Sequence, residues 1–149
     1  MKILIQRVNH ASVQVDYAEV ASITAGLLLL VGFSKDDNED SFQPLIDKIL
    51  NLRIFPKSDG TSGFDISIKD IKGSILIVSQ FTLYADCSRG RRPGFSDAKN
   101  PEEAKVLYDK FLALFKSCYT EGPIAAGVFG GYMKVESEND GPVTIMLEG

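Results

Sequence analysis

Apolar residues in the first third of the chain recur in short runs, with the two-residue alternation typical of β-strands. These runs are Ile3–Val8, Ala11–Val15, Val20–Ile23 and Leu27–Phe33. Short polar stretches and Gly26 separate them, which is typical of antiparallel strands joined by turns. The pattern therefore predicts a meander of strands between residues 2 and 33.

Two later segments change to helical spacing. The first begins at Phe42, with Pro44 either in its first turn or kinking it. Its amphipathic stripe is Phe42, Leu45, Ile46, Ile49 and Leu50. The second begins after Asn100, a preferred N-cap, with Pro101 at its first position. Its expected buried face is Ala104, Leu107, Tyr108, Phe111, Phe115 and Cys118.

The other segments return to strand spacing or form loops. Arg53–Phe55 and Phe64–Ile68 flank a turn-rich stretch, Ser74–Phe81 is an apolar strand, and Val128–Leu147 has strand spacing again. Ala85–Lys99 has Gly, Pro and Arg but no period, which is typical of a surface loop. We therefore expect about seven or eight strands and two main helices, ordered as meander, helix, strands, helix and strands.

Composition is that of an ordinary globular protein. The 149 residues, 44% hydrophobic and 24% charged, suffice for one domain with its own core, so residues 1–149 are expected to form a single domain. No apolar run is long enough for a signal peptide or a membrane span. Cys87 and Cys118 lack metal-site spacing, so we expect free thiols and a cytoplasmic protein without a membrane partner.

Charge argues against one class of partner and leaves room for another. A net charge of −4 is unsuited to general DNA or RNA binding, which depends on many phosphate contacts. Residues 88–99 nevertheless hold four cations against the single carboxylate of Asp97, a local charge of +3. These cations either contact an anionic partner or belong to a solvated loop. They are Arg89, Arg91, Arg92 and Lys99.

The side chains of familiar catalytic mechanisms are scarce. His10 is the single histidine, and no serine or cysteine stands in a GxSxG context. Cys87 could act as a nucleophile only if His10 came beside it, and otherwise it is a free thiol. No spacing of histidines, cysteines or carboxylates suggests a metal site, so neither a metal nor an organic cofactor is expected.

Polar residues and glycines interrupt three strands, and each interruption has two interpretations. After residues 75–78, the Ser79–Thr82 segment has two interpretations. Either its backbone N–H groups hold an oxyanion, or its side chains merely form hydrogen bonds with neighbouring backbone groups where the strand ends. Asn139–Thr144 is either an ordinary Asp-Gly hairpin or a rigid turn with a cis Gly141–Pro142 bond. Gly127–Gly131 either forms a bulge or allows close approach of a ligand.

Seven motifs occur in order along the chain: IQRV at 5–8, KDD at 35–37, LRIF at 52–55, VSQFTLYAD at 78–86, RGRRPGF at 89–95, PEEAKVLYDKF at 101–111 and NDGPVT at 139–144. Together they resemble the D-aminoacyl-tRNA deacylase family over the whole chain, with SQFTL and NDGPVT the most specific. Two stretches depart from the family pattern. Gly60–Ile66 replaces a shorter run, and Gly130-Gly131 replaces Gly-Ala.

With the strand pattern, the resemblance implies a homodimer of single α/β (α+β) domains, each with a barrel-like sheet, and active sites at the subunit interface. Such an enzyme hydrolyses the ester of D-aminoacyl-tRNA, accepts glycyl-tRNA and spares the L-form. A cis Gly141-Pro142 turn from one subunit would enter the pocket of the other and exclude every L-side chain. The protein would position the ester while the 2′-hydroxyl of the terminal adenosine assists water, without metal or cofactor.

Site residues follow from the matching positions. Ser79, Gln80, Phe81 and Thr82 would lie at the ester, with the N–H groups of Phe81 and Thr82 as the oxyanion hole. No base is placed in sequence to activate Thr82 as a nucleophile. Phe129, Gly130 and Met133 would wall the terminal adenine.

The resemblance also implies residues around the turn and along the tRNA. Arg7, Asn139 and Thr144 would brace the Gly-Pro turn, and Ala104 would lie near the pocket. The cations Arg89, Arg91, Arg92 and Lys99 would contact phosphates of the acceptor stem.

Two other functions stay open on the same residues. A non-catalytic tRNA- or nucleotide-binding dimer would bind tRNA without turnover. An esterase for small D-amino-acid derivatives would act on esters that lack tRNA.

Overall fold

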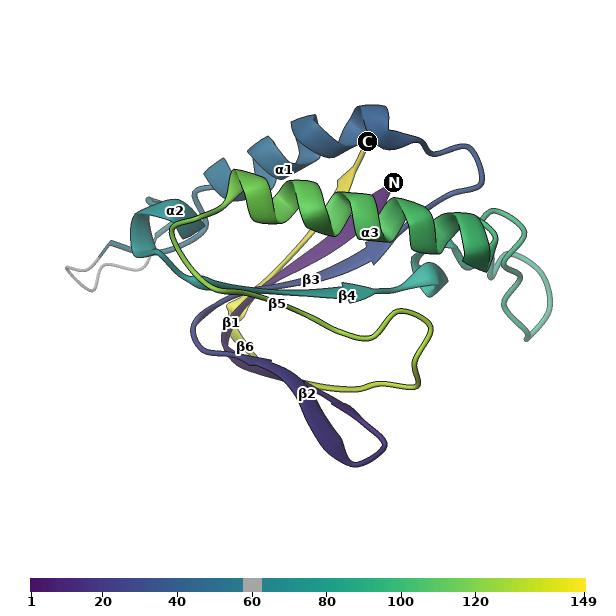
Figure 1. The fold of residues 1–149 in the computed structure, drawn as a ribbon, viewed down its shortest axis with the longest axis horizontal. Coiled ribbons are helices and arrows are strands. Elements are labelled where there is room, and N and C mark those ends of the chain that lie inside the picture. The colour runs from purple at the N-terminus through teal and green to yellow at the C-terminus, as the bar shows by residue number, and fades with distance from the viewer. Residues whose placement is uncertain (58–62) are drawn as a thin grey trace.

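Six strands form one sheet in the computed structural model, which describes residues 1–57 and 63–149 (Figure 1). They are β1 (Lys2–Val15), β2 (Ala18–Ile23), β3 (Gly26–Gly32), β4 (Ser74–Ser79), β5 (Ile124–Ala126) and β6 (Lys134–Glu148). β1 is antiparallel to β2, β3 and β6, whereas β4 is parallel to β3 and β5. The sheet curls until β2 comes close to β4 and β5, so it is nearly closed. The predicted α/β domain with a barrel-like sheet is confirmed.

Two long helices, α1 (Phe42–Asn51) and α3 (Pro101–Cys118), lie side by side over one face of the sheet (Figure 1). Both were predicted, and Pro44 lies in the first turn of α1. The Asn100 side chain caps α3 by accepting a hydrogen bond from the N–H of Glu103 at 3.0 Å. Three short helical turns are η1 (Glu39–Ser41), α2 (Ile68–Ile71) and η2 (Phe81–Tyr84). None of the helices in the described ranges is long and apolar enough to cross a membrane.

The central strands β3 and β4 are buried on both faces, which explains why they are almost continuously apolar. Successive side chains of a strand point to opposite faces. Leu27 therefore packs in the core under α1 and α3, whereas Leu28 packs inside the curl. Val78 is the last residue of β4 in the inner core, and it also lines the cavity described below.

Several predicted strand boundaries are wrong. Ile3–Val8 and Ala11–Val15 form the single strand β1, because His10 stays paired with β6 across the polar break. Phe55 and Ile66 make only one bridge instead of two strands. The segment after Ile66 turns helical because Ser67 and Asp70 form a capping box. The described ranges thus hold six strands, fewer than the expected seven or eight; residues 60–62 of Gly60–Ile66 lie outside those ranges.

The Asn139–Thr144 segment is a bulge inside one strand, and the hairpin interpretation is wrong. Gln6 pairs with Thr144 and Val8 pairs with Asn139, so the four residues Asp140–Val143 lie opposite Arg7 alone. β6 keeps the same antiparallel direction against β1 on both sides of this bulge. The chain therefore pushes a short segment out of the sheet without reversing.

Candidate active site

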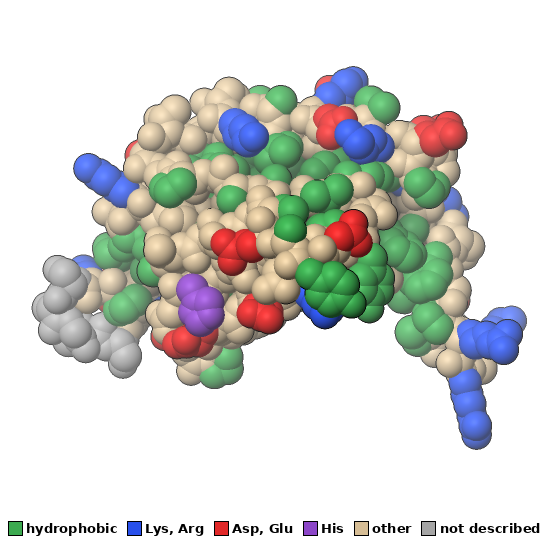
Figure 2. Space-filling model, turned by 60° about the horizontal axis from the view of Figure 1, so that its bottom comes forward, with side chains coloured by type: hydrophobic (Ala, Val, Ile, Leu, Met, Phe, Trp, Pro, Cys, Tyr) green, Lys and Arg blue, Asp and Glu red, His purple; other side chains and the backbone are tan. Residues whose placement is uncertain are grey.

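A cavity of about 690 Å³ opens where β4 ends, beside the start of α3 and the 129–135 segment. Its walls are largely apolar, and the hydrophobic side chains exposed near its mouth include Phe81, Phe95 and Tyr132. Figure 2 shows hydrophobic side chains gathered on one face of the molecule. The cavity brings together seven of the residues predicted for catalysis and substrate binding: Ser79, Gln80, Phe81, Ala104, Phe129, Gly130 and Met133.

The end of β4 places the SQFT residues at this cavity. The N–H of Gln80 donates to the carbonyl of Val31 at 2.7 Å, and the chain then turns into η2. The first internal bond of η2 runs from the N–H of Leu83 to the carbonyl of Gln80, at 3.3 Å. The N–H groups of Phe81 and Thr82 precede it, so they have no acceptor within the helical turn. They are therefore suited to bind an external oxygen, as the oxyanion interpretation requires.

Side chains around η2 fix its position. The Phe81 ring is 56% exposed and meets the Phe95 ring edge-on, with centroids 4.9 Å apart. The Thr82 hydroxyl accepts a hydrogen bond from the Gln80 amide, and Thr82 itself does not line the cavity. Burial first, and then the charge of Asp37, raises the pKa of Tyr84 to about 12. Tyr84 thus stays neutral at physiological pH.

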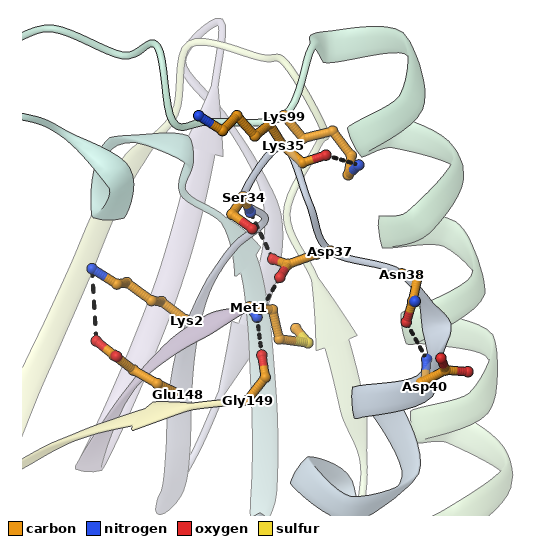
Figure 3. Close-up of polar contacts among 10 residues, drawn as sticks. All are labelled: Met1, Lys2, Ser34, Lys35, Asp37, Asn38, Asp40, Lys99, Glu148 and Gly149. Carbon is orange, nitrogen blue, oxygen red and sulfur yellow. Dashed lines mark hydrogen bonds and ion pairs between the residues drawn. The ribbon is translucent and has the colours of Figure 1, made fainter.

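Hydrogen bonds to the Asp37 side chain connect the 34–37 loop to the N-terminus, which in turn contacts the C-terminus (Figure 3). Its carboxylate accepts from the amino group of Met1 at 2.9 Å and from the N–H of Ser34 at 2.6 Å. The Met1 amino group also donates to the carbonyl of Gly149. Such charge-assisted bonds hold the 34–37 loop in one conformation.

Phe129 and Met133 also line the cavity. The Phe129 ring packs against Tyr108 of α3, with centroids 5.5 Å apart. Tyr108 is buried, its hydroxyl donates to the carbonyl of Ile77 at 3.0 Å, and burial raises its pKa. Gly130 has a φ of +72°, a conformation that glycine adopts without strain. The neutral Tyr108, hydrogen-bonded to Ile77 of β4, thus holds the Phe129 ring in place at the cavity wall.

The four cations predicted to contact phosphates do not share one surface. Arg89, Arg91 and Arg92 are exposed in the loop between η2 and α3. Figure 2 shows Lys and Arg side chains projecting from the edge of the molecule. The Lys99 side chain is only 8% exposed and lines the cavity instead. Its Nζ donates to the carbonyl of Lys35 at 2.8 Å (Figure 3).

The Gly141–Pro142 turn lies at the tip of the β6 bulge and does not line the cavity of its own chain. Its peptide bond is cis, and both residues are exposed. The Asn139 side chain accepts from the N–H of Val143 at 3.1 Å and donates to the Thr144 hydroxyl at 2.8 Å. These bonds connect the two ends of the bulge.

Arg7 holds the bulge from the opposite strand. Its Nη1 donates to the carbonyl of Ile54 at 2.6 Å. Its Nε lies 2.8 Å from Asp140 Oδ2 without making a hydrogen bond, so this contact is electrostatic only. Arg7, Asn139 and Thr144 therefore form one group at the turn, separate from the cavity within the chain.

No sequence pattern predicted some of the residues that line the cavity. Phe33 and Asn100 line it, but their places in the sequence indicate only a strand end and a helix cap. Phe95 could have been found, because a large apolar residue in a polar loop needs a surface to cover it. In the described ranges, no group of three or more His, Cys, Asp or Glu side chains could hold a metal ion.

Comparison with known proteins connects this geometry to a family. The family model described as D-Tyr-tRNA(Tyr) deacylase matches residues 4–148. The chain belongs to this family of hydrolases. The resemblance predicted from the motifs is therefore confirmed.

Two relatives and two solved structures are similar to this chain over nearly its whole length. The D-aminoacyl-tRNA deacylases of Fervidobacterium nodosum and Thermosipho melanesiensis are 49% and 50% identical over 148 residues, which cover 99% of this chain and 97% of each relative. A structure of the c-Myc DNA Unwinding Element Binding Protein matches with a TM-score of 0.93 and 40% identity, covering 100% of this chain and 99% of that one. A probable eukaryotic D-amino acid tRNA deacylase, at 17% identity and a TM-score of 0.84 over 98% and 97% of the chains, shares the fold.

Proposed function

We propose that this chain hydrolyses the ester of D-aminoacyl-tRNA, and of glycyl-tRNA, while sparing L-aminoacyl-tRNA. The observation that carries this proposal is the cavity where the end of β4 meets Phe129, Met133 and Ala104. The terminal adenosine packs against Phe129, and the ester lies at Ser79–Thr82. Base stacking on aromatic side chains is a common way to hold an unpaired nucleotide.

Hydrolysis proceeds through attack of water on the ester carbonyl carbon. The N–H groups of Phe81 and Thr82 bind the developing oxyanion, since both precede the first internal bond of η2. The 2′-hydroxyl of the terminal adenosine relays the proton from water to the 3′-oxygen as the acyl–oxygen bond breaks. The protein contributes position and electrostatics, and no metal or cofactor takes part.

Selection between D- and L-forms comes from a second copy of the chain. The Gly141–Pro142 turn is exposed and outside its own cavity, and the cavity mouth carries exposed apolar side chains on which a partner can pack. The turn of the partner fills the side of the pocket that an L-side chain needs. Every L-residue then meets the same backbone wall, whereas D-residues and glycine do not.

The exposed arginines hold the tRNA. Arg89, Arg91 and Arg92 lie in the loop that follows η2, beside the cavity wall formed by Phe95. They contact backbone phosphates of the acceptor stem, which fixes position without reading sequence.

A heterodimer of two different variants tests this arrangement. Ala104→Phe blocks the cavity, so its homodimer should be inactive, whereas deletion of Gly141 and Pro142 removes the turn, so its homodimer should hydrolyse both the D- and the L-ester. A heterodimer of the two variants contains one intact cavity facing one intact turn, so we expect about half of the wild-type turnover of the D-ester per dimer and no loss of the L-ester.

A matched control places both changes in one subunit and pairs it with a wild-type subunit. The intact cavity of that heterodimer should hydrolyse the L-ester as well if the turn acts on the partner, and should spare the L-ester if the turn acts on its own chain. Purified heterodimers of the two separate variants that hydrolyse the L-ester would contradict the proposal. Binding of tRNA without ester loss would favour a binding module, and hydrolysis of D-tyrosine ethyl ester without tRNA would favour a small-molecule esterase.

A further inference from the structure

A second, smaller hollow of about 320 Å³ lies beside the cavity. Asp37, Asn38, Glu39 and Glu103 line it together with two apolar residues of α3. Lys99 is the one described residue that lines both the hollow and the cavity. The Lys99 side chain is therefore the partition between them.

The partition is held in a fixed position. The Lys99 ammonium donates to the carbonyl of Lys35 at 2.8 Å (Figure 3). It also lies 3.7 Å from Glu103 Oε2. The backbone is fixed too, because the N–H of Lys99 donates to the carbonyl of Phe33 at 2.9 Å. Lysine commonly buries its methylene stem while its charge meets polar groups. Here its polar contacts are with Lys35 and Glu103, so the methylene stem is the part that walls the cavity.

Lys99 lies at the far end of the wall that begins at Phe129. Phe129 contacts Tyr108, Ala104 lies one turn earlier on α3, and Lys99 stands just before the helix. Lys99 and Asn100 precede the first helical residue, Pro101, so the cavity wall continues beyond the start of α3. In the proposed arrangement, the base that packs against Phe129 extends along this wall toward Lys99.

We infer that Lys99 is a specificity-determining residue, whose stem limits the size of the 3′-terminal nucleobase that the cavity accepts. This inference rests on the proposed function, since it takes the terminal adenosine as the group beside Phe129. Shortening the stem joins the cavity to the smaller hollow. The enlarged space accepts a substituent on the adenine that the wild-type protein excludes.

Binding of two stable analogues tests the inference. One is 3′-(D-tyrosylamino)-3′-deoxyadenosine, in which an amide replaces the ester, and the other is its N6-benzyl derivative. We expect the preference for the benzyl compound over the unsubstituted one to be at least about tenfold greater in Lys99→Ala than in wild type, because the wild-type stem clashes with the substituent. Calorimetry measures the binding of both compounds by both proteins.

Val106→Ala is the matched control because Val106 lines the hollow but not the cavity, so the variant enlarges the hollow and leaves the partition in place. It should behave as wild type toward both compounds. No gain for Lys99→Ala, or an equal gain for Val106→Ala, would overturn the inference. If Lys99→Ala does not fold, Lys99→Thr, which also shortens the stem, replaces it. Deacylation of D-tyrosyl-tRNA by the same wild-type sample separates a failure of the proposed function from a failure of this inference.

Discussion

The Thr82 hydroxyl is exposed and already accepts a hydrogen bond from the Gln80 amide. In the proposed reaction only the backbone N–H of Thr82 contacts the substrate. Thr82→Ala removes one neutral hydrogen bond worth about 1 kcal/mol, so kcat/KM should fall by no more than about tenfold. Steady-state deacylation of D-tyrosyl-tRNA measures this. A folded, dimeric Thr82→Ala protein without detectable turnover would show that the hydroxyl itself is catalytic.

Ala104 lines the cavity from α3, opposite the predicted ester-binding residues. Ala104→Phe places a ring where the terminal adenosine should lie, so activity should fall by about 100-fold or more because the substrate is displaced. Ala113→Phe is the control, since Ala113 is exposed on the same helix. Equal activity of both variants in the deacylation assay would mean that the cavity is not the substrate site.

At the scale of elements, the β6 bulge depends on Asn139, which bonds Val143 and Thr144. Asn139→Ala should weaken discrimination between D- and L-tyrosyl-tRNA, because the turn loses its internal bonds and no longer presents a fixed wall. The ratio of kcat/KM for the two esters measures this. Asn9→Ala removes an exposed bond to Glu138 on the same strand pair and should leave the ratio unchanged. A normal ratio for Asn139→Ala would argue that the bulge is held by other contacts.

The Tyr119 hydroxyl fastens the end of α3 to the turn before β4. It donates to the carbonyl of Gly73 at 2.6 Å, and burial raises its pKa to about 12. Because the folded form keeps this proton longer than the unfolded form, the stability that Tyr119 contributes is lost as pH rises from about 10 to about 12. Tyr119→Phe should cost about 1 kcal/mol at neutral pH and should make the alkaline decline shallower.

Urea unfolding of both proteins across this pH range checks the prediction. Tyr132→Phe is the control because Tyr132 is 88% exposed and makes no such bond. An unchanged alkaline decline in Tyr119→Phe would contradict the assigned role.

At this scale, the sequence predicted the elements whose bounds depend on residues close together along the chain. Asn100 and Pro101 fix the start of α3, and the stripe from Phe42 to Leu50 fixes α1, because caps and amphipathic spacing act within a few residues. Asn139–Thr144 could not be read as a bulge, since the same Asp-Gly signal serves a hairpin, and only pairing with β1 decides between them. The burial of Lys99 depends on the distant loop at Lys35, which no local pattern encodes.

At the scale of the whole molecule, the exposed arginine loop predicts how affinity for tRNA responds to salt. Replacing Arg89, Arg91 and Arg92 by Gln should raise KM and flatten the dependence of KM on salt, because each lost phosphate contact removes about 0.9 from the logarithmic slope. As a control, replacing Lys48 of α1, Lys69 of α2 and Lys116 of α3 by Gln should leave this slope unchanged. Equal slopes for the two triple variants would show that the loop does not contact the tRNA.

The cavity and the turn lie apart within one chain, so in the proposed arrangement chiral selection is a property of two assembled subunits. The motif order predicted both the family and a turn that acts on the partner, and the family match confirms the first of these. The most direct test is deacylation of matched D-tyrosyl-tRNA and L-tyrosyl-tRNA by the purified protein with a chelator present. We expect rapid loss of the D-ester alone. Equal loss of both esters, or loss of neither, would contradict the proposal that this chain is a chiral editor of aminoacyl-tRNA.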